Sequence, residues 1–299
     1  MEQQERTFRI GPIRPPSEAN SLLLQVTNGC TWNKCKFCQL YRHTKFKAYS
    51  ADSIKADIDN IAYQADIIRR YQTPLGAWDI DGLNQELGQI PSEEERQCFY
   101  MVANWLVGGG ENVFLQDGNT TALSSGRLSD VLIYLKQAFP GIKRITSYGR
   151  AENLSRVSAE EYAELKEAGL DRIHSGFETG SDAVLQKINK GVTQQQEITA
   201  GKNIKAGGIE LSVYFMPGVG GKELTKENQD AIREAIEAGH KVVISTGRPL
   251  AGATAQAHAL HLDGKGCYII CFNGGEIYDC AARKSLYRKC VPFEEVRYV

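Results

Sequence analysis

The sequence predicts an α/β protein built on a parallel sheet, and two observations predict this class. First, five apolar strand-like runs alternate with segments of helical periodicity between residues 21 and 221. Strands that alternate with helices form parallel sheets joined by right-handed crossovers. Second, each run is followed by a loop of polar residues or glycine, and α/β folds place their sites at such strand ends.

The expected elements follow one another in a regular order. The strands, with the loops that end them, are residues 21–26, 112–116, 144–150, 172–180 and 210–215. Helices are expected at 52–71, 92–106, around 128–135, and at 158–168 and 193–206. The helix at 158–168 has the clearest signals, because Ser158 and Glu161 form a capping box and Gly169 ends it. The segment 73–91 has no clear periodicity, and Asp79–Gly82 within it is interpreted as a solvated turn.

Composition limits the class of function. The chain has 299 residues, with 42% hydrophobic and 24% charged residues, which is ordinary for a globular protein of one large or two smaller domains. A net charge of −1 offers no bulk attraction to nucleic acid or to an anionic membrane. The polar start has no signal-peptide pattern and no apolar run could span a bilayer, so we expect a cytoplasmic protein whose cysteines are ligands or thiols.

Three cysteines, Cys30, Cys35 and Cys38, lie within nine residues directly after the first strand. Their spacing is C-x4-C-x2-C, so one tight loop can direct all three thiolates at one centre. A structural metal site usually closes with four protein ligands, whereas three ligands leave one position open for chemistry. The triplet therefore indicates a metal site with a free coordination position.

Two other interpretations of these cysteines remain open. In a zinc knuckle, Cys35, Cys38 and His43 would match C-x2-C-x4-H, but Ala48 occupies the next ligand position and Cys30 would have to replace it. Buried thiols without a metal are the third option. The remaining cysteines are irregularly spaced and are interpreted as thiols rather than a second cluster: Cys98, Cys267, Cys271, Cys280 and Cys290.

The segment from Gly29 to Cys38 resembles the radical S-adenosylmethionine (radical SAM) family, and Phe37 before the third cysteine fits the same pattern. The first gap is one residue longer than the commonest family spacing. The resemblance implies a partial (βα) barrel over residues 1–222. It also implies that Cys30, Cys35 and Cys38 hold a 4Fe–4S cluster and that the open iron binds S-adenosylmethionine. The implied reaction is reductive cleavage of that cofactor to start radical chemistry, with an external electron donor and a small-molecule substrate.

The same resemblance implies a set of cofactor-binding residues at the strand ends. Asp117-Gly118-Asn119 takes the place of a Gly-Gly-Glu-like segment that contacts the cofactor's amino group, although the tripeptide alone is typical of a turn. Glu178 lies in a Gly-x-Glu-x-Gly segment near the cofactor. The full implied set is Asp117, Gly118, Asn119, Ser147, Arg150, Glu178, Met216, Gly218 and Gly220.

The C-terminal part, residues 223–299, resembles a fragment of the Cof-like haloacid-dehalogenase (HAD) phosphatases. Two segments, 242–249 and 269–279, resemble the family's Thr-Gly-Arg-Pro and Asn-Gly segments, and Thr246 would be the phosphate-binding hydroxyl. The nucleophilic Asp-x-Asp-Gly-Thr segment is missing, and Val219–Glu223 stands in its place. Phosphoryl transfer requires a nucleophile and a metal site, and this segment has neither. The resemblance therefore implies a truncated, Rossmann-like βα fragment.

The junction near Gly221–Leu224 leaves two further expectations. The helix at 224–239 and the strand at 242–245 follow the fifth strand in β-α-β order, so we expect that strand to pair with residues 211–215 as a substitute sixth unit of the barrel. Two alternative functions stay open: a zinc-binding interaction module without catalysis, and a HAD-like remnant that binds phosphate through Thr246 and Arg248 without turnover.

Overall fold

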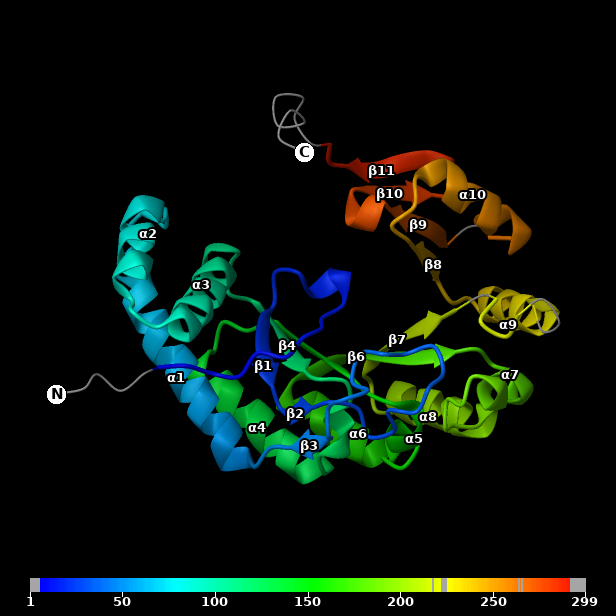
Figure 1. The fold of residues 1–299 in the computed structure, drawn as a ribbon, viewed down its shortest axis with the longest axis horizontal. Helices are drawn as coiled ribbons and strands as arrows, with labels where there is room; N and C mark the ends of the chain where they lie inside the picture. The colour runs from blue at the N-terminus through cyan, green and yellow to red at the C-terminus, as the bar shows by residue number, and fades with distance from the viewer. Residues whose placement is uncertain (1–5, 217, 222–224, 263, 265, 291–299) are drawn as a thin grey trace. The chain divides into compact units, whose positions relative to one another are not determined.

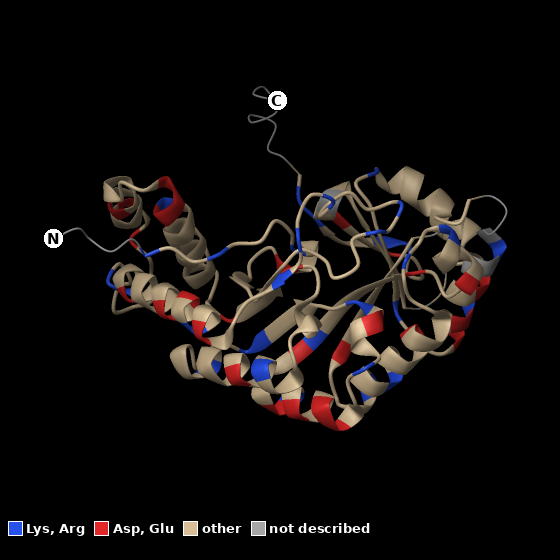
Figure 2. Cartoon of the chain, turned by 60° about the horizontal axis from the view of Figure 1, so that its bottom comes forward, with Lys and Arg blue, Asp and Glu red and all other residues tan. Residues whose placement is uncertain are grey.

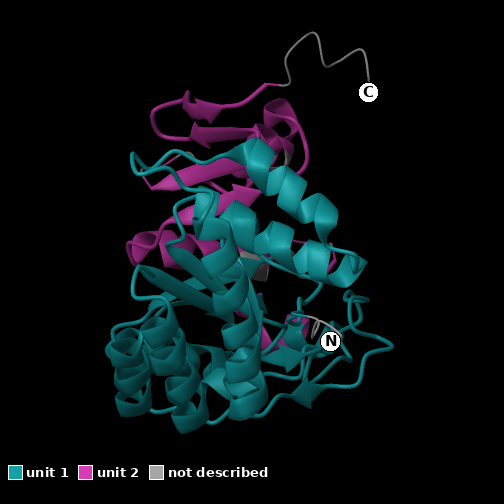
Figure 3. Ribbon diagram, turned by 90° about the vertical axis from the view of Figure 1, so that its left-hand side faces the viewer, with its two compact units in different colours: residues 1–178, 185–215 teal, residues 179–184, 216–299 magenta. Residues whose placement is uncertain are grey.

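The computed structural model describes residues 6–216, 218–221, 225–262, 264 and 266–290. The chain divides into two compact units, which are coloured separately in Figure 3. The first unit comprises residues 1–178 and 185–215, and the second comprises residues 179–184 and 216–299.

The first unit is organised around a five-stranded parallel sheet (Figure 1). Its strands are β1 (Leu22–Gln25), β4 (Asn112–Gln116), β5 (Arg144–Tyr148), β6 (Leu170–Glu178) and β7 (Glu210–Phe215), in the order β1-β4-β5-β6-β7. Every predicted strand is present, and the predicted class of a partial parallel barrel is confirmed. Strands β1 and β7 form the edges among the described residues, so this barrel is open.

Helices follow the strands along the chain between residues 51 and 206. They are α1 (Ala51–Arg69), α2 (Ile80–Gln89), α3 (Glu93–Val107), α4 (Ser125–Ala138), α5 (Ala151–Leu154), α6 (Ala159–Ala168), α7 (Asp182–Lys187) and α8 (Gln194–Ala206). Helices α1, α4, α6 and α8 contact one another in succession and form a layer along the sheet in Figure 1. Figure 2 shows acidic and basic residues interspersed along the outside of this layer, which agrees with the net charge of −1.

The main core lies between this helical layer and the sheet. Alternate strand residues such as Val113, Leu115, Ile145 and Ile173 are buried in it. Because successive side chains of a strand point to opposite faces, Phe114, Thr146 and His174 occupy the other face, inside the open barrel. The strands thus supply apolar residues to one side and a mixed polar and aromatic lining to the other.

Local sequence signals account for the helix boundaries. The capping boxes at Ser158 and Thr193 are both present, and Gly169 ends α6 with φ 116° in the left-handed region. The solvated turn expected at Asp79–Gly82 is wrong: Asp79 caps helix α2 by accepting a hydrogen bond from Gly82 N at 2.9 Å. Only Leu83 of this helix is buried, so its apolar pattern is too weak to be seen in the sequence.

The N-terminal segment from residue 6 to β1 packs along the rest of the first unit. Phe8 is buried and its backbone exchanges hydrogen bonds with the Cys98 thiol. The Gln116 side chain binds the backbone of Gly11 through both its oxygen and its nitrogen. The short helix η1 (Pro16–Glu18) then carries the chain to β1. Sheet residues therefore hold this leader in place.

The second unit is a smaller α/β element with its own core. It contains α9 (Thr225–Glu237), β8 (Val242–Ser245), α10 (Leu250–Ala259), β9 (Cys267–Cys271), η4 (Phe272–Gly274), β10 (Glu276–Asp279) and β11 (Lys284–Arg288). Its sheet has the order β11-β10-β9-β8, in which only the β8–β9 pair is parallel. The core includes Ile232 of α9, Ala253 and Ala257 of α10, and Ile269 of β9.

The expectation that β8 would complete the first sheet is wrong. Strand β8 pairs with β9, with Val242 opposite Cys267, whereas β7 pairs with β6. The physical reason is that the crossover through α10 provides β8 with its own parallel partner and a shared apolar core. The boundary predicted between residues 222 and 223 stays a prediction, since residues 222–224 lie outside the described part of the chain.

No helix in the described part of the chain combines the length and the apolar composition needed to cross a membrane.

Candidate cofactor site

The three clustered cysteines lie in a loop at the carboxyl end of β1. This cysteine loop, residues 29–46, connects the short antiparallel strands β2 (Thr27–Asn28) and β3 (Lys47–Ala48). Gly29 begins it with φ 82°, a conformation that glycine adopts without strain. Cys30, Cys35 and Cys38 are all half-buried thiols. The sequence-based placement at a strand end is therefore observed, while their role as cluster ligands stays a prediction.

The electrostatic surroundings of Cys35 show how the thiols are placed. Burial raises the pKa of Cys35, the positive charges of Lys190 and Arg150 oppose that rise, and the other two cysteines add to it. Cys35 therefore lies within electrostatic range of the other two thiols and of two cations, which favour its thiolate. Within the described ranges, no three Cys, His, Asp or Glu side chains already form a metal-binding group. Three thiols fit an iron–sulfur cluster in number and chemistry, but the three side chains do not converge on one metal position.

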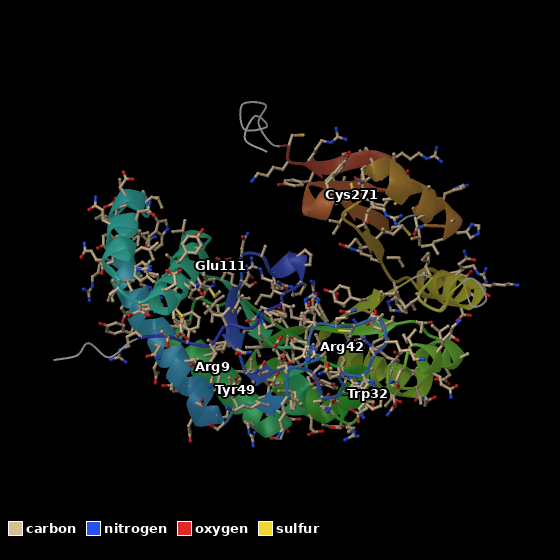
Figure 4. All side chains as sticks on the ribbon, in the orientation of Figure 1. Arg9, Trp32, Arg42, Tyr49, Glu111 and Cys271 are labelled. Carbon is tan, nitrogen blue, oxygen red and sulfur yellow. The ribbon has the colours of Figure 1, made fainter. Side chains whose placement is uncertain are left out.

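The middle of the cysteine loop is bound by a segment far away in the sequence. Lys36 N donates to Ile188 O at 2.9 Å, and Trp32 Nε1 donates to Asn189 O at 2.8 Å. The Asn189 amide donates in return to Lys34 O at 2.9 Å. Trp32 is labelled in Figure 4. No signal in the sequence points to this contact, since it joins residues 152 to 157 positions apart.

Lys190 connects several of the predicted site residues. Its carbonyl accepts a hydrogen bond from Arg150 Nη2 at 3.2 Å and lies 4.0 Å from Cys35 Sγ. Its ammonium group donates to Glu178 Oε1 at 2.8 Å, and both side chains of this pair are nearly buried. Lys190 was missed by sequence reasoning, yet it bridges a cysteine, the predicted arginine and the predicted glutamate.

Glu178 ends β6 in an unusual backbone conformation. Its φ of 69° lies in the left-handed region, which costs a residue with a side chain about 1 kcal/mol or more. Gly176 leaves room for its carboxylate, because a Cβ at residue 176 would lie 2.3 Å from Glu178 Oε1. Local strain of this kind is typical of functional sites. The structure thus holds Glu178 in place at a carboxyl strand end, as the Gly-x-Glu-x-Gly resemblance implied.

Asn119 is the centre of a buried amide network. Its Nδ2 donates to Thr31 Oγ1 at 2.9 Å and to Asn153 Oδ1 at 2.8 Å. Its Oδ1 accepts from Arg150 N at 3.0 Å and from Thr121 Oγ1 at 3.1 Å. Every polar atom of this side chain is used within the protein. Asn119 therefore joins the cysteine loop, through Thr31, to the segment that follows β5.

Asp117 and Gly118 come between β4 and Asn119. Asp117 is completely buried, and its carboxylate accepts hydrogen bonds from the Tyr41 hydroxyl and from Gly29 N. Burial raises the pKa of Asp117, and the hydrogen bond from Tyr41 opposes that rise. The resemblance implies that this segment contacts the cofactor, whereas the Asp117 carboxylate binds the cysteine loop.

The remaining predicted residues are Ser147, Met216, Gly218 and Gly220. Ser147 is buried, and strand alternation puts it on the face of Ile145, in the helix-covered core; its Oγ has no hydrogen-bond partner among the described residues. Met216, Gly218 and Gly220 belong to the second unit, so their relation to the cysteine loop is not defined. They form tight turns in which Gly218 has φ 85°. Their predicted roles stay predictions.

The open barrel also contains a polar network that sequence reasoning missed. Glu18 is completely buried and pairs with Arg144 Nη2 at 2.8 Å. His174 Nε2 lies 3.4 Å from Glu18 Oε1, and the Tyr214 hydroxyl lies 3.3 Å from His174 Nδ1. The rings of Tyr148 and Tyr214 pack around His174. Charged residues within strand-like runs, such as Arg144, were the available signal for this lining.

Comparisons with known proteins identify the family. The model of the radical SAM superfamily matches residues 24–228, which is more than half of the chain and includes the three cysteines. The chain therefore belongs to the radical SAM family. The model for haloacid dehalogenase-like hydrolases matches residues 219–299, which corresponds to the C-terminal resemblance.

Three curated proteins show similarity over parts of the chain. The heme chaperone HemW of Bacillus subtilis is 28% identical over 42% of this chain, and 4'-phospho-dehydrooxetanocin synthase of Priestia megaterium is 25% identical over 66% of it. A protein of Streptococcus pyogenes serotype M6 that is provisionally named as a phosphatase is 32% identical over 25% of the chain. The chain spans 33%, 23% and 28% of the length of these three relatives, respectively.

Two solved structures also show similarity to parts of the chain. The apo form of the cobalamin-dependent S-adenosylmethionine radical enzyme OxsB is 20% identical and covers 71% of this chain and 26% of its own, with a TM-score of 0.47. HydG, a maturase of the [FeFe]-hydrogenase, is 13% identical and covers 76% of this chain and 44% of its own, with a TM-score of 0.41.

Proposed function

We propose that this chain is a radical SAM enzyme that binds a 4Fe–4S cluster through Cys30, Cys35 and Cys38 and cleaves S-adenosylmethionine reductively. One observation carries the proposal: three half-buried thiols share one loop at the carboxyl end of a parallel sheet, beside two cations. Family membership over residues 24–228 supports it. Three thiolates leave one iron of a cubic cluster without a protein ligand, which is where a cofactor can bind.

The protein's own residues would position the bound groups. When present, the cluster supplies the electron that cleaves the sulfonium bond, and the chain supplies binding and orientation. Lys190 and Arg150 place positive charge beside Cys35 and so favour the thiolates that ligate iron. Glu178, held by Lys190, offers a carboxylate near the cysteine loop. Two residues implied by the resemblance, Asn119 and Arg150, both bind Thr31 of the cysteine loop and belong to the proposed cofactor site.

An external one-electron donor of the reductase, ferredoxin or flavodoxin type and a small-molecule substrate belong to this proposal. The substrate is not specified by the site, because the shared core of the family starts the radical reaction and other parts select its target. We infer no phosphoryl transfer for the C-terminal unit. The Thr246 hydroxyl accepts a hydrogen bond from Arg248 N at 3.2 Å, but Val219-Gly220-Gly221 offers no nucleophile.

Metal identity tests the proposal first. The protein is reconstituted under anaerobic conditions with iron and sulfide, and iron, sulfide and zinc are then quantified per chain. We expect about four irons and four sulfides per chain and little zinc. The triple variant Cys30→Ala, Cys35→Ala, Cys38→Ala should hold none of them. Stoichiometric zinc without iron in the wild-type protein would contradict the proposal and support an interaction module.

A further inference from the structure

We propose that Asp117 is the positioning residue of the cysteine loop, which it holds by binding residues on both sides of the three cysteines. This inference rests on the proposed function, because the loop matters as the holder of a cluster. It differs from the role implied by resemblance, in which this segment contacts the amino group of S-adenosylmethionine. If Asp117 holds the loop, its replacement should speed loss of the cluster. If it contacts the cofactor, its replacement should weaken binding of S-adenosylmethionine and leave cluster retention unchanged.

The hydrogen bonds of Asp117 show the two-ended attachment. Gly29, immediately before Cys30, donates its N–H to Asp117 Oδ2 at 3.4 Å. Tyr41, three residues after Cys38, donates its hydroxyl to Asp117 Oδ1. One carboxylate therefore joins the start and the end of the segment that carries all three cysteines.

Close packing at the next residue gives an independent observation. A Cβ on Gly118 would lie 2.9 Å from Tyr41 Cε2 and 3.1 Å from the Gly29 carbonyl oxygen. The backbone that follows β4 thus touches both ends of the cysteine loop, and glycine is needed for this approach. Asp117 N also donates to Thr27 Oγ1 of β2 at 3.2 Å. The contact is therefore a packed junction and does not depend on one rotamer.

Burial explains why Asp117 is better suited to holding the loop than to meeting a ligand. The residue has 0% of its surface exposed, and Tyr41 has 5%. A buried carboxylate without partners is costly, and donors from the loop offset that cost. If either Gly29 or Tyr41 moves away, the buried carboxylate loses a donor, so the attachment opposes opening of the loop.

The two ends and the middle of the loop have separate attachments. Ile188 and Asn189 bind the middle, between Cys30 and Cys38, as described above. Loss of the Asp117 contact would release Cys30 and Cys38 while Cys35 stays beside Lys190. Such a change alters the relative positions of the three ligands and should speed loss of the cluster.

The experiment compares wild-type protein with Tyr41→Phe and Asp117→Asn. Tyr41→Phe keeps the ring that packs on Gly118 and removes only the hydroxyl. Tyr134→Phe is the matched control, because its hydroxyl donates to Asp59 at 2.7 Å on the helical layer, away from the cysteine loop. After reconstitution, the rate of iron release to an Fe(II) chelator is measured below the unfolding temperature, and binding of S-adenosylmethionine is measured alongside.

We expect Tyr41→Phe and Asp117→Asn to release iron about tenfold faster than wild type, as residues that orient metal ligands commonly do when changed. Tyr134→Phe should release iron at the wild-type rate. A second readout needs no cluster: in the apo-proteins, alkylation of Cys30 and Cys38 should be faster in both loop variants, while Cys98 stays unreactive. Each readout reports on the loop and not on overall stability.

Three results would overturn the inference. Iron release at the wild-type rate combined with weaker S-adenosylmethionine binding in Asp117→Asn would return Asp117 to the role implied by resemblance. Wild-type release and wild-type alkylation would show that the contact does not hold the loop. Failure of Tyr41→Phe to fold would show that the contact supports the whole unit. Absence of iron in the wild-type protein is a different result, which contradicts the proposed function itself.

Discussion

At the scale of single residues, the site depends on glycines, because a larger residue at these positions would overlap a neighbouring side chain. Gly176 lies opposite the Glu178–Lys190 pair, and Gly191 lies opposite Trp32. The Gly-x-Glu-x-Gly pattern pointed to Glu178 in the sequence. Lys190 could not be found in this way, because a lone lysine after a helix is ordinary and its role depends on contacts with Cys35 and Arg150.

Gly176→Ala should destabilise the protein by about 1 to 3 kcal/mol, because the added methyl group overlaps Glu178 Oε1 and lies 3.3 Å from Lys190 Nζ. Thermal unfolding of the apo-protein measures the effect. Gly126→Ala is the control, since it lies in α4 with no atom within 4 Å of the added methyl group. That control should be neutral or slightly stabilising. Equal stability of both variants would show that the Glu178–Lys190 pair has room to move.

Glu18 gives a prediction on pH. Burial alone would raise its pKa, but hydrogen bonds from His174 and Ser21 and the charge of Arg144 outweigh burial and lower the pKa from 4.5 to about 2. The folded-state pKa lies below the unfolded one, so the stabilisation is complete above pH 4.5 and is lost as the pH falls toward 2. The difference amounts to about 3 kcal/mol.

Glu18→Gln should therefore lose about 3 kcal/mol of unfolding free energy near pH 7 relative to wild type, with the gap narrowing below pH 4.5. Denaturant unfolding at several pH values measures this difference. Glu210→Gln, which breaks a more exposed pair with Arg172, should change stability by only about 0.5 kcal/mol. A pH-independent difference between Glu18→Gln and wild type would contradict the assigned ion pair.

At the scale of elements, local signals were sufficient for helices and strands but not for their long-range partners. Helices α6 and α8 were predicted because each begins with a capping box. Helix α2 was missed because it buries only Leu83. The pairing of β8 was predicted wrongly, since β-α-β order alone does not determine which of two sheets a strand joins. The contact between the cysteine loop and residues 188–191 is of the same long-range kind.

Gly191→Ala should detach the middle of the cysteine loop. A Cβ there would lie 2.3 Å from the Trp32 ring, and the φ of 69° disfavours alanine. Gly208→Ala is a matched control for the backbone strain, because its φ is 79° and its nearest contact is 3.9 Å away. We expect reconstituted iron per chain to fall at least twofold in Gly191→Ala and to stay unchanged in Gly208→Ala. Similar losses in both would show that backbone strain, not the Trp32 contact, is responsible.

At the scale of the whole molecule, two family models match different parts of one chain, and each compact unit has a separate core. Ile173 lies in the first core and Ile269 in the second, and both are completely buried. The change of character past Gly221 was visible in the sequence because HAD-like segments replace the barrel pattern there. Family membership and the five strands could also be predicted, whereas the contacts within the polar barrel lining could not, because they join residues far apart in the sequence.

Ile269→Ala should remove about 2 to 5 kcal/mol of stability from the second unit and leave the reconstituted iron content unchanged. Ile173→Ala, the matching truncation in the first core, should lower iron content as well as stability. Calorimetry together with iron analysis distinguishes the two. Loss of iron in Ile269→Ala would show that the second unit is required for the cluster site.

The most direct test of the central claim is release of 5′-deoxyadenosine from S-adenosylmethionine by the reconstituted, reduced protein. We expect release by the wild-type chain and none by the Cys30→Ala, Cys35→Ala, Cys38→Ala variant treated in the same way. Release that depends on all three cysteines would establish a working initiation site and direct the search to substrates. A wild-type protein that carries about four irons but releases no more than the variant would contradict the proposed activity.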